Sequence, residues 1–213
     1  MEDDIRTEMV LVKDDVASAP ACEKDRRRGV AGMVYAFKAA GAAAENGGTL
    51  EEVAAAARHA LENIRTMGVA LSSCTVPQVG EPTFSIAEDE IEIGMGIHGE
   101  KGIEVRKMMT ADEVADILVE RITADMPLVS GDEVSVMVNG LGATPLEEQL
   151  IVYGRVHKLL EDKGVKVFMP HVGEFATSME MAGLSVTIFK LDGQLKELLL
   201  SPAKTPFYTN LNK

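Results

Sequence analysis

Hydrophobic and polar positions along the chain follow two periods, one typical of strands and one typical of helices. Apolar and β-branched residues dominate short segments that we expect to be strands, namely Ile91–Ile97, Glu133–Asn139, Val165–Met169 and Ser185–Lys190. Longer segments with helical periodicity lie between them, at Thr110–Asp125, Pro145–Lys163 and roughly Gly173–Met181. This alternation predicts an α/β fold, a layered sheet with helices packed on it.

The first third of the chain predicts a helical hairpin. Arg28–Ala44 is rich in small apolar residues, which favours a helix that packs closely against a neighbour, and Asn46-Gly47-Gly48 ends it. Thr49 with Glu52 forms a capping-box pattern, so a second helix should begin here and continue to about Met67. A loop rich in Pro and Gly follows over Leu71–Phe84.

Ile5–Val12, close to the start of the sequence, becomes continuously apolar from Met9 onward and predicts a strand. A buried strand needs neighbours on both sides. We therefore interpret it as the last strand of a preceding sheet. At the other end, Pro202 and Pro206 predict an irregular tail.

The composition supports one sizeable packed domain. Of 213 residues, 46% are hydrophobic, with 12 Met and no Trp, so the core should be aliphatic and rich in methionine. No apolar segment is long enough to predict a membrane span, and no leader pattern opens the sequence. Cys22 and Cys74 are far apart, which predicts two free thiols and a cytoplasmic location.

The formal net charge of −13 argues against a nucleic-acid partner, because little could neutralise a series of phosphates. The four histidines are scattered without metal-ligand spacing, so we expect no metal site. His59 and His157 fall in helical patterns and should be surface or capping residues. His171 follows Pro170 at the end of a strand, where it either has a structural role or lines a second site.

His98 is the strongest candidate for chemistry. It lies in Gly94-Met95-Gly96-Ile97-His98-Gly99-Glu100-Lys101-Gly102, where the strand pattern gives way to glycine. Glycines on both sides allow a small ligand to reach the imidazole. The alternative is a glycine-rich turn that carries an incidental histidine.

The segment Asn139–Pro145 is a weaker candidate. It follows a predicted buried strand and precedes a helix, the place where ligands bind in open α/β sheets. The free N–H groups of such a turn favour anions or carbonyl oxygens. It matches neither a P-loop nor a dinucleotide fingerprint, so a plain connecting turn is the alternative.

Several segments together resemble a known family. They are Arg28-Gly29-Val30-Ala31-Gly32, Thr66-Met67-Gly68-Val69-Ala70-Leu71-Ser72-Ser73-Cys74, the segment Gly94–Glu100, Asn139-Gly140-Leu141-Gly142, and Glu180-Met181-Ala182-Gly183-Leu184-Ser185. In this order and spacing they resemble the substrate-binding K subunit of dihydroxyacetone (glycerone) kinases. The resemblance covers nearly the whole chain, and the Gly94–Glu100 motif is its most specific part.

The resemblance implies a function and a fold. In that family the histidine of this motif binds the ketone covalently, and His98 is the matching position, both for substrate binding and for catalysis. The fold implied is the C-terminal, DegV-like domain of the K subunit. The resemblance also implies that a separate nucleotide-bearing L subunit carries ATP or ADP with Mg²⁺. We expect no cofactor on this chain.

The chemistry can also be understood from the imidazole itself. A neutral imidazole can add through Nε2 to a carbonyl carbon and form a hemiaminal. That reaction selects short ketoses and aldehydes over glycerol, which has no carbonyl, and so supplies a specificity that few contacts could give. It also orients the substrate hydroxyl for the phosphoryl transfer that produces dihydroxyacetone phosphate. Binding should weaken when acid protonates the ring.

The sequence also departs from the family pattern. The family's N-terminal portion carries a Gly-His-Glu-Pro loop and an Asn-Tyr-Thr-Gly-Asp segment with the aspartate base, and neither occurs here. We therefore expect residues 1–24 to be a remnant strand and linker of that portion, 25–200 the α/β domain with His98, and 201–213 a tail. The chain would be a fragment, the product of a misplaced start, or half of a split subunit.

Two further expectations concern partners and alternatives. Apolar segments that have lost their neighbours predict a homo-oligomer or a complex with an N-terminal companion chain. Besides a part of a glycerone kinase, the chain could be a regulatory protein that binds dihydroxyacetone, or an inactive truncated paralogue.

Overall fold

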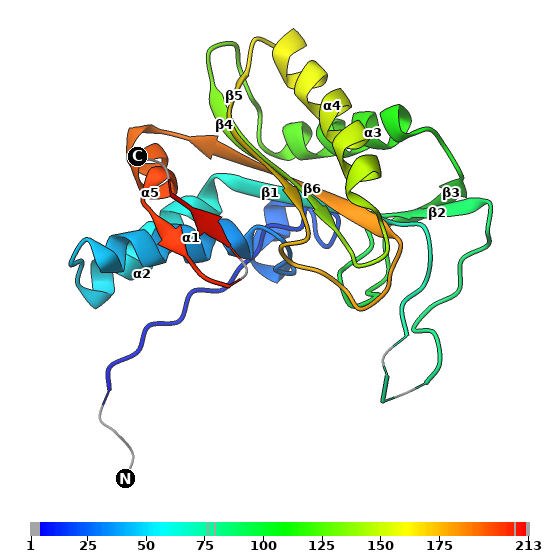
Figure 1. The fold of residues 1–213 in the computed structure, drawn as a ribbon, viewed down its shortest axis with the longest axis horizontal. Coiled ribbons are helices and arrows are strands. Elements are labelled where there is room, and N and C mark those ends of the chain that lie inside the picture. Colours follow the sequence, from blue (N-terminus) through cyan, green and yellow to red (C-terminus); the bar gives the residue numbers. More distant parts are fainter. Residues whose placement is uncertain (1–4, 76, 79, 207, 212–213) are drawn as a thin grey trace.

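The computed structural model describes residues 5–75, 77–78, 80–206 and 208–211, and it has the expected α/β architecture (Figure 1). In chain order, the first elements are a short 3₁₀ helix η1 (Ala21–Arg26), α1 (Met33–Glu45), α2 (Leu50–Glu62), β1 (Ile64–Ala70), β2 (Glu90–Ile93), β3 (Glu104–Lys107) and α3 (Ala111–Asp125). They are followed by β4 (Glu133–Gly140), α4 (Leu146–Asp162), β5 (Lys166–Gly173), β6 (Gly183–Leu191), α5 (Gly193–Leu200), β7 (Ala203–Lys204) and β8 (Thr209–Asn210).

Six strands form the central sheet in the order β3-β2-β1-β6-β4-β5. The pair β4–β5 is parallel and is connected through α4, and the other neighbours are antiparallel. Helices cover both faces, with α3 and α4 on one side and α1, α2 and α5 on the other (Figure 1). The molecule is therefore a three-layer sandwich with the sheet in the middle.

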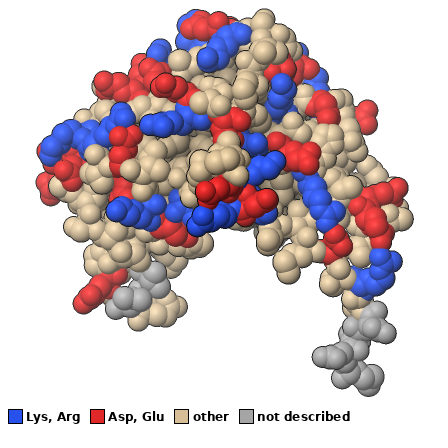
Figure 2. Space-filling view, turned by 180° about the vertical axis from the view of Figure 1, so that it is seen from behind, with Lys and Arg blue, Asp and Glu red and all other residues tan. Residues whose placement is uncertain are grey.

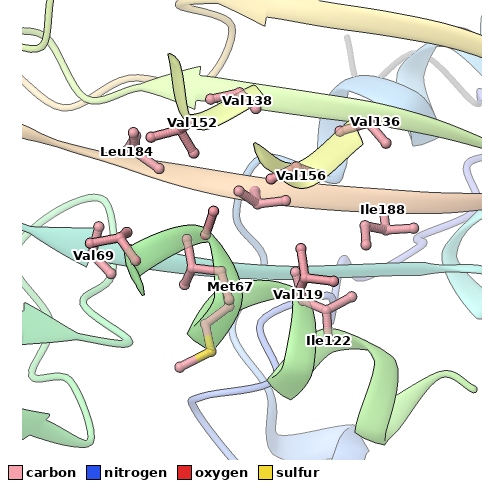
Figure 3. Packing of buried hydrophobic residues seen from close by; sticks show 14 of the residues in the cluster. Met67, Val69, Val119, Ile122, Val136, Val138, Val152, Val156, Leu184 and Ile188 are labelled. Atoms are coloured by element: carbon pink, nitrogen blue, oxygen red, sulfur yellow. The ribbon is translucent and has the colours of Figure 1, made fainter. Parts of the chain in front are cut away.

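The period of two along the strands divides the core between these layers. On β4, Val134, Val136 and Val138 pack in the cluster beneath α3 and α4 (Figure 3), whereas Met137 packs against α1 and α5. On β6, Val186 and Ile188 face the first cluster and Phe189 the second. A sheet covered on both faces explains why its central strands are apolar throughout.

Several predicted helices begin or end at the residues whose capping patterns predicted it. Thr110 caps α3 through a capping box with Glu113, and Thr49 caps α2 through one with Glu52. Gly164 adopts a φ of 72° just after α4, in the left-handed region that ends many helices. The helical hairpin of α1 and α2 is also present.

The strand predicted over Ile5–Val12 does not form. Residues 5–12 are extended but form no strand, and Ile5, Met9 and Leu11 are exposed. The chain reaches the sheet only at Asp15, which bridges to Thr66. Arg6 and Glu8 instead pair with side chains of α2, so this segment lies along the helix and does not pair with a strand.

The boundaries of α1, α2 and β2 also differ from the predictions. Helix α1 begins at Met33, not Arg28, because the Asp14 carboxylate accepts the N–H groups of Val30 and Gly32 at 2.8 Å and holds a turn there. Helix α2 ends at Glu62, and the predicted extension to Met67 is β1, paired along its length with β6. Strand β2 ends at Ile93 because Gly94 turns the chain.

The predicted helix over 173–181 does not form. The Asn139 side chain accepts the N–H groups of Phe175 and Ala176, each at 2.8 Å, and holds that segment as a loop. Strand β3 and helix α5 were not predicted, and the tail expected to be irregular contains the β7–β8 pairing.

Acidic and basic side chains are interspersed over the face in Figure 2. Among the described residues, no helix combines the length and apolar character that crossing a membrane requires.

Candidate functional site

His98 lies in a turn between β2 and β3. Gly94 and Gly99 have φ values of 80° and 86°, a conformation that L side chains rarely adopt, and they bend the chain on either side of the histidine. A Cβ at Gly99 would overlap the Thr83 hydroxyl, and one at Gly94 would crowd Ala17. The His98 side chain is 76% exposed. The glycines therefore bring the turn close to its neighbours while the imidazole faces solvent.

An apolar cluster beneath the turn fixes its position. Met95 and Ile97, the alternate residues before His98, are buried in it. Its buried members come from every segment that carries the family resemblance: Val30, Ala70, Cys74, Met95, Ile97, Leu141 and Met181. Segments that are distant in the sequence thus converge directly under the candidate residue.

Arg28 ties the turn to the body of the protein. Its guanidinium donates to Asp15 Oδ2 through Nε and Nη2, at 3.0 and 2.7 Å. The same Nη2 donates to the Gly94 carbonyl at 3.1 Å. Because the Asp15 side chain is only 2% exposed, the Asp15–Arg28 pair is a fixed anchor for the start of the turn.

Glu100 contacts His98 twice. Its Oε2 accepts the backbone N–H of His98 at 2.9 Å, and its Oε1 lies 3.1 Å from His98 Nδ1. Burial acts to raise the pKa of the Glu100 carboxyl, but the hydrogen bonds it accepts from His98 and from its own backbone leave that pKa below its ordinary value. Glu100 is therefore ionised. It was not identified from the sequence, although its place two residues after His98 was a usable signal.

The turn at Asn139–Pro145 serves the structure. Its N–H groups at Leu141 and Ala143 donate to Gly183 and Met181, each at 3.2 Å. Thr144 Oγ1 bonds both the N–H and the carbonyl of Gly183 at 2.7 Å. These groups are occupied within the protein, so the turn's contribution is to place Leu141 beneath the His98 turn.

The remaining histidines lie away from His98. His171 on β5 is largely buried, with Nδ1 3.2 Å from the Tyr35 hydroxyl and Nε2 3.1 Å from the Tyr208 hydroxyl. Burial lowers its pKa to about 4, so the ring is neutral at physiological pH. His59 lies 2.8 Å from Asp192, and His157 is exposed on α4. These contacts support the structural role, and the alternative of a second site stays a prediction.

The structure also shows where the thiols and the possible metal ligands lie. No group of three or more His, Cys, Asp or Glu side chains within the described part of the chain could hold a metal ion. Cys22 is exposed and Cys74 buried, and both are free thiols, as predicted. At the turn itself, the ionisable side chains in contact with each other are the His98 imidazole and the Glu100 carboxylate.

Comparison with known proteins shows which family the chain belongs to. Residues 1–207 match the profile of the Dak1 domain. The chain belongs to the Dak1 domain family. It is 48% identical over 204 residues to "PTS-dependent dihydroxyacetone kinase 1, dihydroxyacetone-binding subunit DhaK" of Listeria innocua, a match that covers 95% of this chain and 62% of that protein. The chain thus spans about three fifths of that relative's length.

Solved structures of relatives share the fold. The dihydroxyacetone kinase of C. freundii in its native form superposes with a TM-score of 0.83 at 30% identity, over 96% of this chain and 37% of that one. The dihydroxyacetone kinase operon co-activator Dha-DhaQ gives 0.82 at 32% identity, over 91% and 60%. A DegV lipid binding protein of Thermotoga maritima, 14% identical with a TM-score of 0.52 over 76% and 56%, shows likeness of fold alone and supports the DegV-like architecture.

Proposed function

We propose that this chain is the ketone-binding part of a dihydroxyacetone kinase and that His98 holds the ketone covalently. The observation that carries the proposal is the His98 turn itself. An exposed imidazole lies between two glycines in a turn anchored by Arg28 and by a buried apolar cluster. The names of the similar proteins, dihydroxyacetone-binding subunits and dihydroxyacetone kinases, support dihydroxyacetone as the ligand.

The proposed step is the addition of the ring nitrogen to the carbonyl. The Nε2 lone pair forms a bond to the carbonyl carbon, and the carbonyl π electrons move onto the oxygen, which takes a proton from solvent. The product is a hemiaminal whose ring carries a positive charge. Glycerol cannot react because it has no carbonyl. The bond also fixes the terminal hydroxyl of the ketone in one orientation for phosphoryl transfer.

The phosphoryl group would come from a partner. We propose that a nucleotide-bearing L subunit, with ATP or ADP and Mg²⁺, docks over the bound ketone and phosphorylates it to dihydroxyacetone phosphate. His98 is then the substrate-binding and catalytic residue of this chain. The role of this chain is to present the ketone, and that of the partner is to supply the phosphoryl donor.

The test uses dihydroxyacetone labelled with ¹³C at the carbonyl. In the wild-type protein we expect the bound carbon to move from the carbonyl region of the NMR spectrum to that of a tetrahedral carbon. The His98→Ala variant should lose this signal. It should keep its free energy of unfolding within about 0.5 kcal/mol, because an exposed side chain contributes little packing.

His157→Ala is the matched control, since His157 is also an exposed histidine and lies on α4. It should form the adduct normally. A protein-bound tetrahedral signal of equal strength in His98→Ala would overturn the covalent role.

A regulatory function is the second candidate. The likeness to the co-activator Dha-DhaQ, of the same order as the likeness to the C. freundii kinase, favours it. The two candidates separate when the chain is mixed with the nucleotide-bearing subunit of a related kinase and its phosphoryl donor. Formation of dihydroxyacetone phosphate supports the kinase. Adduct formation without phosphorylation supports a regulator only when a companion chain with the family's aspartate segment has also been added.

A further inference from the structure

The contact between Glu100 and His98 determines which ring nitrogen carries the proton. A neutral imidazole has one N–H, and the hydrogen bond at one nitrogen selects the state of the other. An ionised carboxylate can only accept hydrogen bonds. Because Glu100 Oε1 lies 3.1 Å from Nδ1, that nitrogen must be the donor, and Nε2 keeps its lone pair.

We infer that Glu100 is the positioning residue for ketone addition: its carboxylate holds the His98 ring with the proton on Nδ1 and Nε2 directed to the ketone. The inference rests on the proposed function and adds a second residue to it. Glu100 also accepts the His98 backbone N–H at 2.9 Å, so one carboxylate fixes both the ring and the peptide that carries it.

The charge of Glu100 also suits the product of the addition. When Nε2 bonds to carbon, the ring becomes cationic and still carries its Nδ1 proton. The nearby carboxylate then faces a positive charge in the adduct and a neutral ring before it. An interaction that is stronger in the adduct than in the free protein favours its formation.

Gly96 provides the space that this carboxylate occupies. A Cβ at position 96 would overlap Glu100 Oε2 and would lie 3.1 Å from Arg28 Nη1. The overlapping atom is the end of a flexible side chain, so an alanine here would displace the carboxylate and leave the backbone in place. Gly96→Ala is therefore a second way to remove the contact, with Glu100 itself unchanged.

The test is Glu100→Gln, examined by ¹⁵N NMR of the His98 ring without ketone and by dihydroxyacetone binding. The glutamine amide can donate to Nδ1, which favours the tautomer with the proton on Nε2. We expect that shift in the spectrum. We also expect ketone binding weaker on the order of tenfold to a hundredfold, the range known for groups that orient metal-bound histidines.

Matched controls isolate the contact. Glu104→Gln removes the same charge from the start of β3, where Glu104 pairs with Arg106. Gly154→Ala adds the same methyl group on α4, where a Cβ meets nothing within 4 Å. Both should retain the wild-type tautomer and affinity, whereas Gly96→Ala should behave like Glu100→Gln.

The outcomes separate this inference from the proposed function. If Glu100→Gln and Gly96→Ala keep the Nδ1 proton and the wild-type affinity, the positioning role is wrong even though the ketone binds. Equal weakening by Glu104→Gln would assign the effect to net charge and also overturn it. If the wild-type ring has the Nδ1 proton but forms no adduct, the covalent function fails while the tautomer assignment stands.

Discussion

Asp125 shows how a single residue can hold several elements together. Its Oδ1 accepts Arg27 Nη2 at 2.6 Å and its Oδ2 accepts Arg27 Nη1 at 2.9 Å, while Arg65 of β1 also donates to Oδ2. The side chains of Arg27 and Asp125 are 2% and 10% exposed. This cluster joins the end of α3, the start of β1 and the segment before α1. Of the ion pairs between described residues, Arg27–Asp125 has the least exposed pair of side chains.

Asp125→Asn should lower the free energy of unfolding by about 3–5 kcal/mol, because it leaves two arginines without their buried partner. Urea unfolding at pH 7 measures this. The control is Asp116→Asn on the same helix, where an exposed pair with Arg155 contributes at most about 1 kcal/mol. A loss at Asp125 no larger than the loss at Asp116 would contradict the prediction.

The Asp125 cluster should also make the free energy of unfolding depend on pH in the acid range. Hydrogen bonds from Arg27, with a contribution from Arg65, lower the pKa of Asp125 to about 2. The unfolded state binds its proton near an ordinary pKa of about 3.9. The stabilisation is therefore fully present above about pH 4 and is lost as pH falls toward 2. Unfolding of the wild-type protein should show this slope, and Asp125→Asn should lack it.

At the scale of elements, His171 connects the layers of the fold. It lies on β5, and its ring nitrogens reach Tyr35 of α1 and Tyr208 of the tail. The Tyr35 hydroxyl in turn lies 2.8 Å from Ser135 Oγ of β4. Stacking of the His171 ring on Tyr208 brings the tail against the edge of the sheet. One buried ring thus joins four parts of the chain.

This arrangement should make the fold sensitive to mild acid. The unfolded imidazole takes up a proton near pH 6.5, whereas burial holds the folded pKa of His171 at about 4. Because the folded pKa is depressed, the contribution is fully present above about pH 6.5 and is lost as pH falls to 4. Over this window the loss should approach about 3 kcal/mol.

Urea unfolding at several pH values between 7.5 and 4.5 tests this. His171→Gln removes the titrating ring and should flatten the profile, at a cost in stability at neutral pH. His157→Gln, an exposed control, should leave the slope unchanged. A His171→Gln profile as steep as that of the wild-type protein would exclude this histidine as the cause.

The elements also show what could be predicted from sequence and what could not. Thr110–Asp125 was predicted almost to the residue because its cap and its periodicity are local. The helix α2 was wrongly extended to about Met67, because the segment Ile64–Ala70 becomes a strand only by pairing with β6, far along the chain. The loop at 173–181 likewise depends on the distant Asn139 side chain.

The candidate site also combines features that are local in the sequence with features that depend on the complete fold. His98 and its glycines form one short motif, so the sequence alone drew attention to this segment, and the role of His98 stays a prediction. The role of Glu100 depends on where its side chain points. The convergence of Val30, Leu141 and Met181 beneath the turn depends on the complete sheet. The spacing of Glu100 from His98 was a local signal for its contact, whereas the convergence of the cluster has no local signal.

At the scale of the whole molecule, exposed apolar side chains predict association. Ile5, Met9 and Leu11 are 72%, 80% and 63% exposed on the extended segment before Asp15, and Phe37 of α1 is 68% exposed. The segment is not the strand edge expected from sequence, but exposed apolar groups of this size still favour an interface. A homo-oligomer or a companion chain would cover them.

Sedimentation at micromolar protein concentration is the measurement. We expect a species larger than one chain, and substitution of Met9 and Leu11 by Ser should shift the distribution toward the monomer. A Val129→Ser variant is the control, because Val129 is 63% exposed in the loop before β4, on another part of the chain. A monomer at every concentration would contradict the prediction.

The cluster under His98 has a consequence for how the protein acquires its function. Its side chains come from positions between Val30 and Met181, so the cluster cannot close until segments far apart in the sequence have met. Contacts of such long sequence separation are the slow ones in folding. Ketone binding would therefore report that folding is complete, and not that any one element has formed. Under the proposed function, the ketone would in turn stabilise the folded molecule by mass action, because it would bind the folded state and not the unfolded one.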